Sequence, residues 1–217
     1  MQQIYSHLSQ PYLDLHISHA NGAYYYSKEL VENIVPKIKT NRPWVTIYGE
    51  GMCADNAIMV IHNNAHPERY DWIDKYNNLI LICSTIKTLK VMIKNHPKCH
   101  VIYVPLSIDT KYVKQFKAKR KTKDTCYFGR KSKCPESILE NDKIDKLYGK
   151  DREALLKQLA KYKKAYAIGR CAIEAKCLGC KVIPHEGEYE NVDFELLDNK
   201  DVIPELQRLL NEIDGVS

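Results

Sequence analysis

Two segments in the second half of the chain combine glycine with basic residues in a way that is typical of anion binding. The first reads Phe128-Gly129-Arg130-Lys131-Ser132-Lys133, and the second begins Ile168-Gly169-Arg170. Glycine lets the backbone approach a ligand closely, and the forked donors of arginine suit phosphate oxygens. The alternative for the first segment is a surface turn with solvated charges. The residues expected to bind a diphosphate are Gly129, Arg130, Lys131, Lys133, Gly169 and Arg170.

Glu174 lies about one turn inside the helix that is expected to follow Gly169. At helical spacing, Glu174 shares a face with Cys171 and Leu178. A carboxylate on that face can accept hydrogen bonds from two neighbouring hydroxyl groups, such as those of a ribose. The alternative is a first-turn glutamate that only complements the helix dipole. The residues themselves leave both interpretations open.

Polar residues in the first half of the chain follow apolar runs that are expected to be strands. His62 ends the run AIMVIH, and Glu50 and Asp55 follow the run WVTIY. Histidine and carboxylate side chains at strand ends can act as bases toward an acceptor hydroxyl. Their alternatives are turn-capping histidines and solvated loop acids. Tyr24 belongs to three consecutive tyrosines that cannot all face a core. We therefore expect catalytic roles for His62, Glu50 and Asp55, and acceptor contacts for His66 and Tyr24.

The elements that would position these residues alternate between short apolar strands and helical patterns. This alternation predicts parallel sheets covered by helices. Expected strands are 13–18, 44–48, 57–62, 78–83, 100–105, 125–129, 143–149, 164–169 and 180–184. Expected helices are 23–38, 68–76, 85–95, 151–162, 170–179 and 201–213.

A segment with only positive charge, Thr110 to Lys123, interrupts this pattern. We therefore predict an α/β protein with two Rossmann-like lobes that face each other across a cleft. The lobes are 1–110 and 124–217, joined by a basic linker at 111–123. Ligands in open α/β sheets bind beyond the carboxyl ends of the strands, so the cleft is the expected site.

Composition places the chain among cytosolic globular proteins. It has 217 residues, 44% of them hydrophobic, and a net charge of +6. No apolar run approaches the roughly 20 residues that span a bilayer, and the N-terminus lacks the pattern of a signal peptide. The eight cysteines are then expected to be reduced core thiols. Cys177 and Cys180 form a CxxC with no second pair, so no metal site is expected.

Five segments resemble motifs of the GT-B glycosyltransferases, in matching order over most of the chain. The most specific is GRCAIEAKCLGCKVI, in which Gly169, Glu174 and Gly179 fall in the register of the family signature. The others are NGAYYYSKELVENIVP, LILICST, VIYVPLSID and YFGRKSK. One departure is Tyr166, because many relatives carry a glutamate eight residues before the residue that matches Glu174.

The resemblance implies a transferase that takes a sugar from a nucleotide-diphosphate sugar, expected to be a UDP-sugar. It makes 124–217 the donor-binding lobe and 1–110 the acceptor-side lobe, and it requires no metal or other cofactor. Glu174 would bind the donor ribose, Gly169 and Arg170 would lie against the phosphates or the sugar, and Gly22 would face the donor from the first lobe. Arg130 and Lys133, with Lys131 as a substitute, would hold the diphosphate.

Only the size and the charge of the chain indicate what the acceptor of the sugar is. The chain resembles small virus-encoded transferases, including those of phages, that modify hydroxymethylated DNA bases, which would place it in the host cytoplasm. A cell-wall or lipid-linked acceptor is the alternative. Two further functions remain open: a non-catalytic nucleotide-sugar-binding protein, and a nucleic-acid-binding protein on the same scaffold. The sequence gives no indication of oligomeric state.

Overall fold

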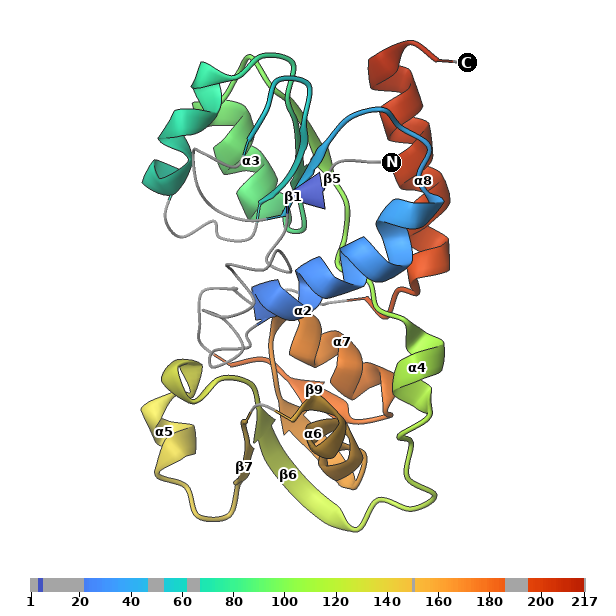
Figure 1. Ribbon diagram of the computed structural model, residues 1–217. Helices are drawn as coiled ribbons and strands as arrows, with labels where there is room; N and C mark the ends of the chain where they lie inside the picture. The colour runs from blue at the N-terminus through green and yellow to red at the C-terminus, as the bar shows by residue number, and fades with distance from the viewer. Residues whose placement is uncertain are drawn as a thin grey trace. The chain divides into compact units, whose positions relative to one another are not determined.

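The computed structural model describes residues 4–5, 22–46, 53–61, 67–149, 151–185 and 195–216. The chain forms two compact units: Ala23–Pro105 with Lys200–Ser217 make up most of the first, and Leu106–Asn199 most of the second. Each unit has its own parallel sheet, which confirms the mixed α/β class (Figure 1). Within the described ranges, no helix is long and apolar enough to cross a bilayer. The strand expected at 13–18 lies outside them.

The sheet of the first unit contains five parallel strands in the order β1-β2-β3-β4-β5. Four of the expected strands are confirmed in shortened form, and β1 was not predicted. Along the described strands, the order in the sheet follows the order in the chain without a reversal. The strands are β1 (Ile4–Tyr5), β2 (Trp44–Val45), β3 (Ile58–Ile61), β4 (Ile80–Cys83) and β5 (His100–Tyr103).

The helix expected at 23–38 is divided into three parts. It begins as α2 (Gly22–Glu29), continues as the π-helical turn Leu30–Ile34 and ends as the 3-10 turn Val35–Lys37. Pro36 has no amide hydrogen to donate, which explains why regular hydrogen bonding stops there. A 3-10 segment, Pro67–Lys75, follows β3, and α3 (Ile86–Asn95) follows β4.

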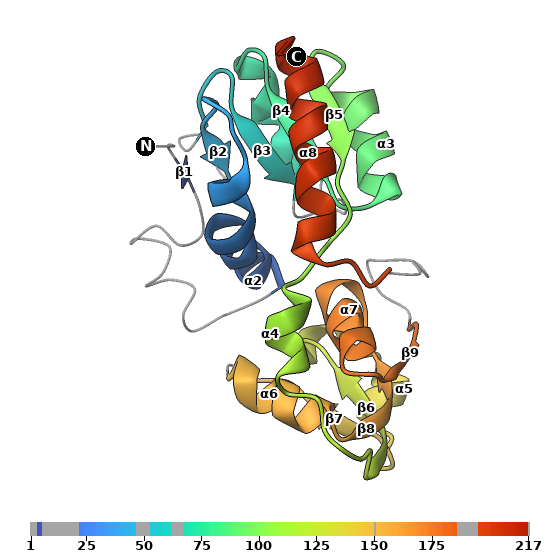
Figure 2. The ribbon, with the colours of Figure 1, turned by 90° about the vertical axis from the view of Figure 1, so that its right-hand side faces the viewer.

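Both faces of the first sheet are buried. Met59, Leu81 and Cys83 point to the face that is covered by the 3-10 segment and α3, where Tyr70 and Met92 complete a core. Side chains alternate along a strand, so Ile58 and Ile80 point to the opposite face. In Figure 2, α8 (Asn199–Asp214) lies along this sheet. Its apolar stripe of Val202, Leu206 and Leu210 is buried.

Helix α8 belongs to the first unit, although we expected 201–213 to close the second lobe. Its Gln207 accepts a hydrogen bond from the amide of Lys39 at 2.6 Å and donates to the carbonyl of the same residue at 3.0 Å. The amphipathic pattern of a helix shows that it will cover an apolar face, but not which one.

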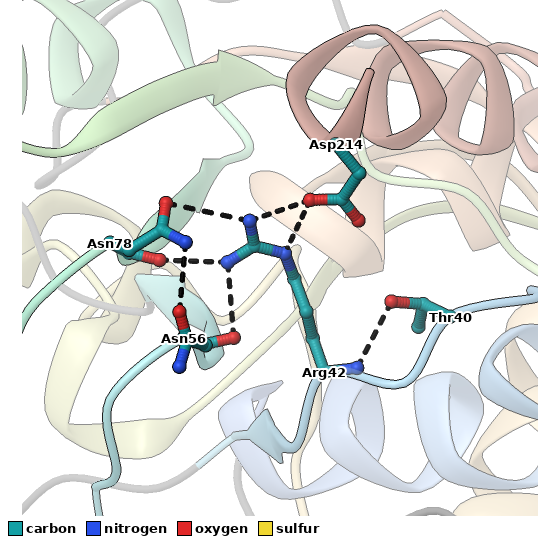
Figure 3. Close-up of polar contacts among 5 residues, drawn as sticks. All are labelled: Thr40, Arg42, Asn56, Asn78 and Asp214. Carbon is teal, nitrogen blue, oxygen red and sulfur yellow. Dashed lines mark hydrogen bonds and ion pairs between the residues drawn. The ribbon is translucent and has the colours of Figure 1, made fainter. Parts of the chain in front are cut away.

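A cluster of polar residues, Arg42, Asn56, Asn78 and Asp214, fixes the end of α8 to the first sheet (Figure 3). Arg42 donates from Nε and Nη2 to Asp214 Oδ1 at 2.8 and 2.6 Å. Its Nη1 donates to the backbone carbonyls of Asn56 and Asn78 at 3.1 and 2.7 Å. Both asparagines have left-handed backbones and come shortly before β3 and β4. We call this group the Arg42 cluster.

The sheet of the second unit has the order β7-β6-β8-β9. The chain therefore moves from β6 to β7 on one side and then returns past β6 to β8 and β9 on the other. All four expected strands are confirmed, with shifted ends. They are β6 (Lys123–Phe128), β7 (Asp145–Leu147), β8 (Tyr162–Tyr166) and β9 (Lys181–Ile183).

The helices of the second unit lie on both faces of its sheet (Figure 1). Right-handed crossovers require α5 (Glu136–Leu139) on one face and α6 (Arg152–Leu159) and α7 (Gly169–Cys177) on the other, because the strand order reverses at β6. The packing agrees with this rule. Residues of α6 and α7 share a core with Cys126 and Phe128, whereas Ile138 of α5 packs with Tyr127.

The basic segment expected as a linker is part of the second unit. Asp109 caps the short helix α4 (Thr110–Lys114) by accepting from the amide of Tyr112 at 2.9 Å. Val113 is buried in the second core, and Phe116 packs against it. Lys121 is half-buried and donates to the carbonyl of Leu178 at 2.7 Å, whereas the lysines before it in this segment are exposed.

Candidate anion-binding site

The reversal of strand order marks one edge of the second sheet. In open parallel sheets, ligands bind outside the carboxyl ends of the strands where the order reverses. Strand β6 leads into Arg130, β7 leads into Arg152 at the start of α6, and β8 leads into Arg170 at the start of α7. An arginine thus follows each of these three strands at the edge where a ligand is expected.

These residues form one electrostatic group, which we call the arginine cluster: Arg130, Arg152 and Arg170. Burial raises the pKa of the Cys171 thiol, and the positive charges of Arg152, Arg170 and Arg130 oppose that rise. Arg152 and Arg170 both pair with Glu174 in α7, and Arg130 follows the neighbouring strand β6 at the same edge of the sheet.

Glu174 supplies a buried carboxylate to this cluster. Its side chain is fully buried, and Oε1 accepts from Arg170 Nε at 2.9 Å and pairs with Arg152. Within the described part of the chain, Oε2 has no hydrogen-bond partner. Arg130 is exposed at the same edge of the sheet, and its positive charge can be neutralised by an anion.

The start of α7 adds backbone donors to the site. Ile168 precedes the helix, and its apolar side chain cannot cap the first amides. Gly169 has a φ of +56°, and among the described residues a Cβ built on it would meet no atom within 4 Å. Amides at the positive end of the helix dipole favour an anion.

The segment after β6 has a partly structural explanation. A Cβ on Gly129 would lie 2.7 Å from the hydroxyl of Tyr127, which donates to the carbonyl of Arg130 at 2.8 Å. Gly129 is therefore required by Tyr127, independently of any ligand. Lys131 and Lys133 are exposed on a 3-10 turn, as the solvated-turn alternative expects.

The candidates of the first unit do not form a described site. Asp55 comes just before β3, at the amino edge of the sheet, and accepts from the amide of Asn77 at 2.7 Å. It therefore stabilises a turn at the edge opposite to the one that ligands use. Tyr24 lies in α2, which begins at Gly22, but its side chain is outside the described part. Glu50, His62 and His66 are also outside it.

Arg152 is the site residue that the sequence did not reveal. It is the first residue of α6, directly after Asp151, which caps that helix by accepting from the amide of Ala154 at 3.0 Å. Among described residues, no group of three or more His, Cys, Asp or Glu side chains could hold a metal ion. Cys177 and Cys180 are buried as free thiols.

No protein-family model, curated protein or solved structure matches the chain. The functional conclusion therefore comes from the site itself.

Proposed function

We propose that the protein is a glycosyltransferase whose donor is a nucleotide-diphosphate sugar, with the diphosphate bound by the arginine cluster and the start of α7. One observation carries this proposal: arginines follow three strands at the edge where the strand order reverses, and two of them pair with the buried Glu174. In the full proposal, the two units correspond to the two lobes of a reduced GT-B enzyme, and the first unit is the acceptor side.

The chemistry of transfer fits this arrangement. The bond between the anomeric carbon and a diphosphate oxygen breaks, and the oxygen of the acceptor hydroxyl bonds to that carbon. The proton of the hydroxyl passes to a base or to water, and a nucleoside diphosphate leaves with additional negative charge. Guanidinium groups and helix amides that are already in place stabilise this charge as it develops. They can perform this task without a metal ion. The proposed donor is a UDP-sugar, and the proposed acceptor is a hydroxymethylated DNA base.

We assign Glu174 a positioning role rather than the expected ribose contact. Its side chain is fully buried, and Oε1 already pairs with Arg152 and Arg170. A buried carboxylate restricts the orientations of both guanidinium groups, which reduces the entropy lost when they bind a diphosphate.

The first test is a thermal-shift screen with UDP, GDP, CDP and their common sugar conjugates. A ligand that binds only the folded state raises the melting temperature. We expect one nucleotide family to stabilise the wild type, and Arg152→Gln and Arg170→Gln to weaken its binding about ten-fold or more. Arg120→Gln, an exposed change in the same unit, is the matched control. The proposal fails if no nucleotide shifts the melting temperature of the wild type.

A non-catalytic nucleotide-sugar-binding protein is the second candidate, and Tyr166 favours it. Many of the GT-B glycosyltransferases that the sequence resembles carry a glutamate at this position, and the side chain of Tyr166 lines a cavity on the α5 face of the sheet. Incubation with the stabilising nucleotide sugar separates the two functions. A transferase slowly releases nucleoside diphosphate by hydrolysis, whereas a binding protein returns the donor intact.

A further inference from the structure

A cavity of about 490 Å³ opens on the α5 face of the second sheet. Ile138, Ile144 and Pro184 form apolar parts of its wall, and the rings of Tyr166 and His185 also line it. This face is opposite to the one covered by α6 and α7, because Tyr166 packs with the α5 core while its neighbour Ala165 packs with the other core.

The walls of this cavity suit a planar heterocycle. His185 lies 5.4 Å from the ring centre of Tyr127, tilted by 55°, which helps to fix the orientation of its ring. Asn141 accepts from the amide of Lys143 at 3.0 Å through Oδ1, and among the described residues its Nδ2 makes no hydrogen bond. Ser137 also lines the cavity. Apolar side chains, aromatic rings and polar groups such as this amide and this hydroxyl can bind a nucleobase by stacking and by its polar edge.

Two lysines stand side by side next to this cavity. Lys164 is on the same face of β8 as Tyr166, two residues or roughly 7 Å away, and its partner across β9 is Lys181. Both side chains are exposed, and Asp124 lies 3.8 Å from Lys164. Like charges directly opposite on neighbouring strands are unfavourable unless an anion lies between them.

The second unit as a whole also carries an excess of positive charge. Residues 106–199 contain 21 lysines and arginines against 15 acidic residues, so they carry the entire net charge of +6. A surface of this sign attracts polyanions.

We propose that the α5 face binds single-stranded nucleic acid. One unpaired base enters the cavity beside Tyr166 and His185, and the adjoining phosphates lie over Lys164 and Lys181. A base that is paired within a duplex cannot enter such a cavity, which selects a single strand. Two adjacent lysines within a unit of excess positive charge favour a chain of phosphates over a free nucleotide. Tyr166 lies on the α5 face, whereas α7 with Glu174 lies on the other face of the sheet, and the proposal does not depend on the proposed sugar transfer.

The electrostatic part is tested with fluorescein-labelled oligothymidylate, by fluorescence anisotropy over a series of salt concentrations. Each phosphate contact with a single strand contributes about 0.7 to the slope of log affinity against log salt. The double variant Lys164→Gln/Lys181→Gln is therefore expected to reduce this slope by about 1.4. Lys163→Gln, the same charge change on the opposite face of β8, is expected to have little effect.

The cavity part is tested with Tyr166→Leu, which keeps an apolar side chain but removes the ring. We expect about a ten-fold loss of affinity for the oligonucleotide, because stacking of one base is removed. The melting temperature and the affinity for UDP, measured in parallel, should remain close to those of the wild type. Those two readouts separate a failure of this surface from a failure of the arginine cluster.

Four results would overturn the proposal. The wild type does not bind the oligonucleotide, or Lys163→Gln weakens binding as much as the double variant. Thymidine monophosphate binds as tightly as the strand, which would make the cavity a mononucleotide site. A duplex of equal length binds as tightly as the single strand, which would reduce the surface to general electrostatic attraction.

Discussion

Arginine lies at the amino edge of the sheet in the first unit and at the carboxyl edge in the second. In the first unit, Arg42 is buried, and its guanidinium donates to Asp214 and to the carbonyls of Asn56 and Asn78. In the second unit, Arg152 and Arg170 pair with the carboxylate of Glu174, and Arg130 follows β6 at the same edge of the sheet. Arg42 therefore holds the fold of the first unit, whereas the arginines of the second unit lie at the edge of the sheet where a ligand is expected.

The two units also differ in the order of their strands and in their net charge. The described strands of the first sheet follow chain order, and residues outside 106–199 have 12 basic and 12 acidic side chains. The strand order of the second sheet reverses, and residues 106–199 of the second unit carry the whole net charge. The reversal creates the edge where helix starts converge, and the charge excess selects an anion there.

The largest expected effect is that of Glu174→Gln, which removes the buried carboxylate from the arginine cluster. Breaking a buried ion pair on one side should lower the free energy of unfolding by about 3 kcal/mol. Urea unfolding measures this loss. Added phosphate should restore part of it, because the anion replaces the missing charge. Glu153→Gln, an exposed change at the start of α6, should cost little. Equal losses in both variants would show that Glu174 is not a buried partner of the arginines.

Arg42→Lys tests whether the arginine of the first unit has a purely structural role. Lysine keeps the charge but cannot donate to Asp214 and two carbonyls at once. We expect a loss of about 2 kcal/mol in the free energy of unfolding and no change in UDP affinity. Arg208→Lys is the control, since Arg208 pairs with Glu205 in an exposed position and such pairs contribute little. A fall in UDP affinity would contradict a purely structural Arg42.

Gly169→Ala should affect the ligand more than the fold. Alanine at a φ of +56° costs about 1 kcal/mol, and its methyl group enters the open space beside the first amides of α7. Gly179→Ala is a matched control, because Gly179 follows the other end of α7 with a φ of +77°. Both variants should melt earlier by similar amounts, and only Gly169→Ala should lose affinity for phosphate or UDP in titration calorimetry.

The smallest effect concerns Asp145 at the amino edge of the second sheet. The hydroxyl of Tyr162 and then the ammonium of Lys123 lower the pKa of this carboxyl group below 3.8. Its stabilisation is therefore present above pH 3.8 and is lost as the pH falls through the lower pKa of the folded state. Asp145→Asn should cost less than about 1 kcal/mol near neutral pH, since water screens this exposed pair. In acid unfolding, the variant and the wild type should converge.

The sequence predicted the strands and helices of the second unit better than it predicted which side chains contact one another. Apolar runs and glycines located β6, β8 and α7 because those signals are local. Arg152 had no local signal, since Asp151-Arg152-Glu153 reads as an ordinary helix start. It reaches Glu174 through the strand order of the sheet, which no motif encodes. The same applies to Arg42 and Asp214, which are 172 residues apart.

Two other differences had signals that could have been used. Val113 and Phe116 are spaced by three within the basic segment, which is the period of a helix with a buried side. Tyr166 was interpreted only as a replaced glutamate. The alternation of KAYAIG places it opposite to Ala165, on the face where the cavity lies.

The late position of α8 in the chain affects the order in which the two units can complete their cores during synthesis. The ribosome releases the strands of the first sheet early, but the helix that covers Ile58 and Ile80 is the last described element to emerge. The second unit is almost continuous in the chain, so it can complete its core while the first still exposes an apolar face. Until α8 is synthesised, this apolar face stays uncovered, and uncovered apolar surface is what makes a partly folded chain prone to aggregation.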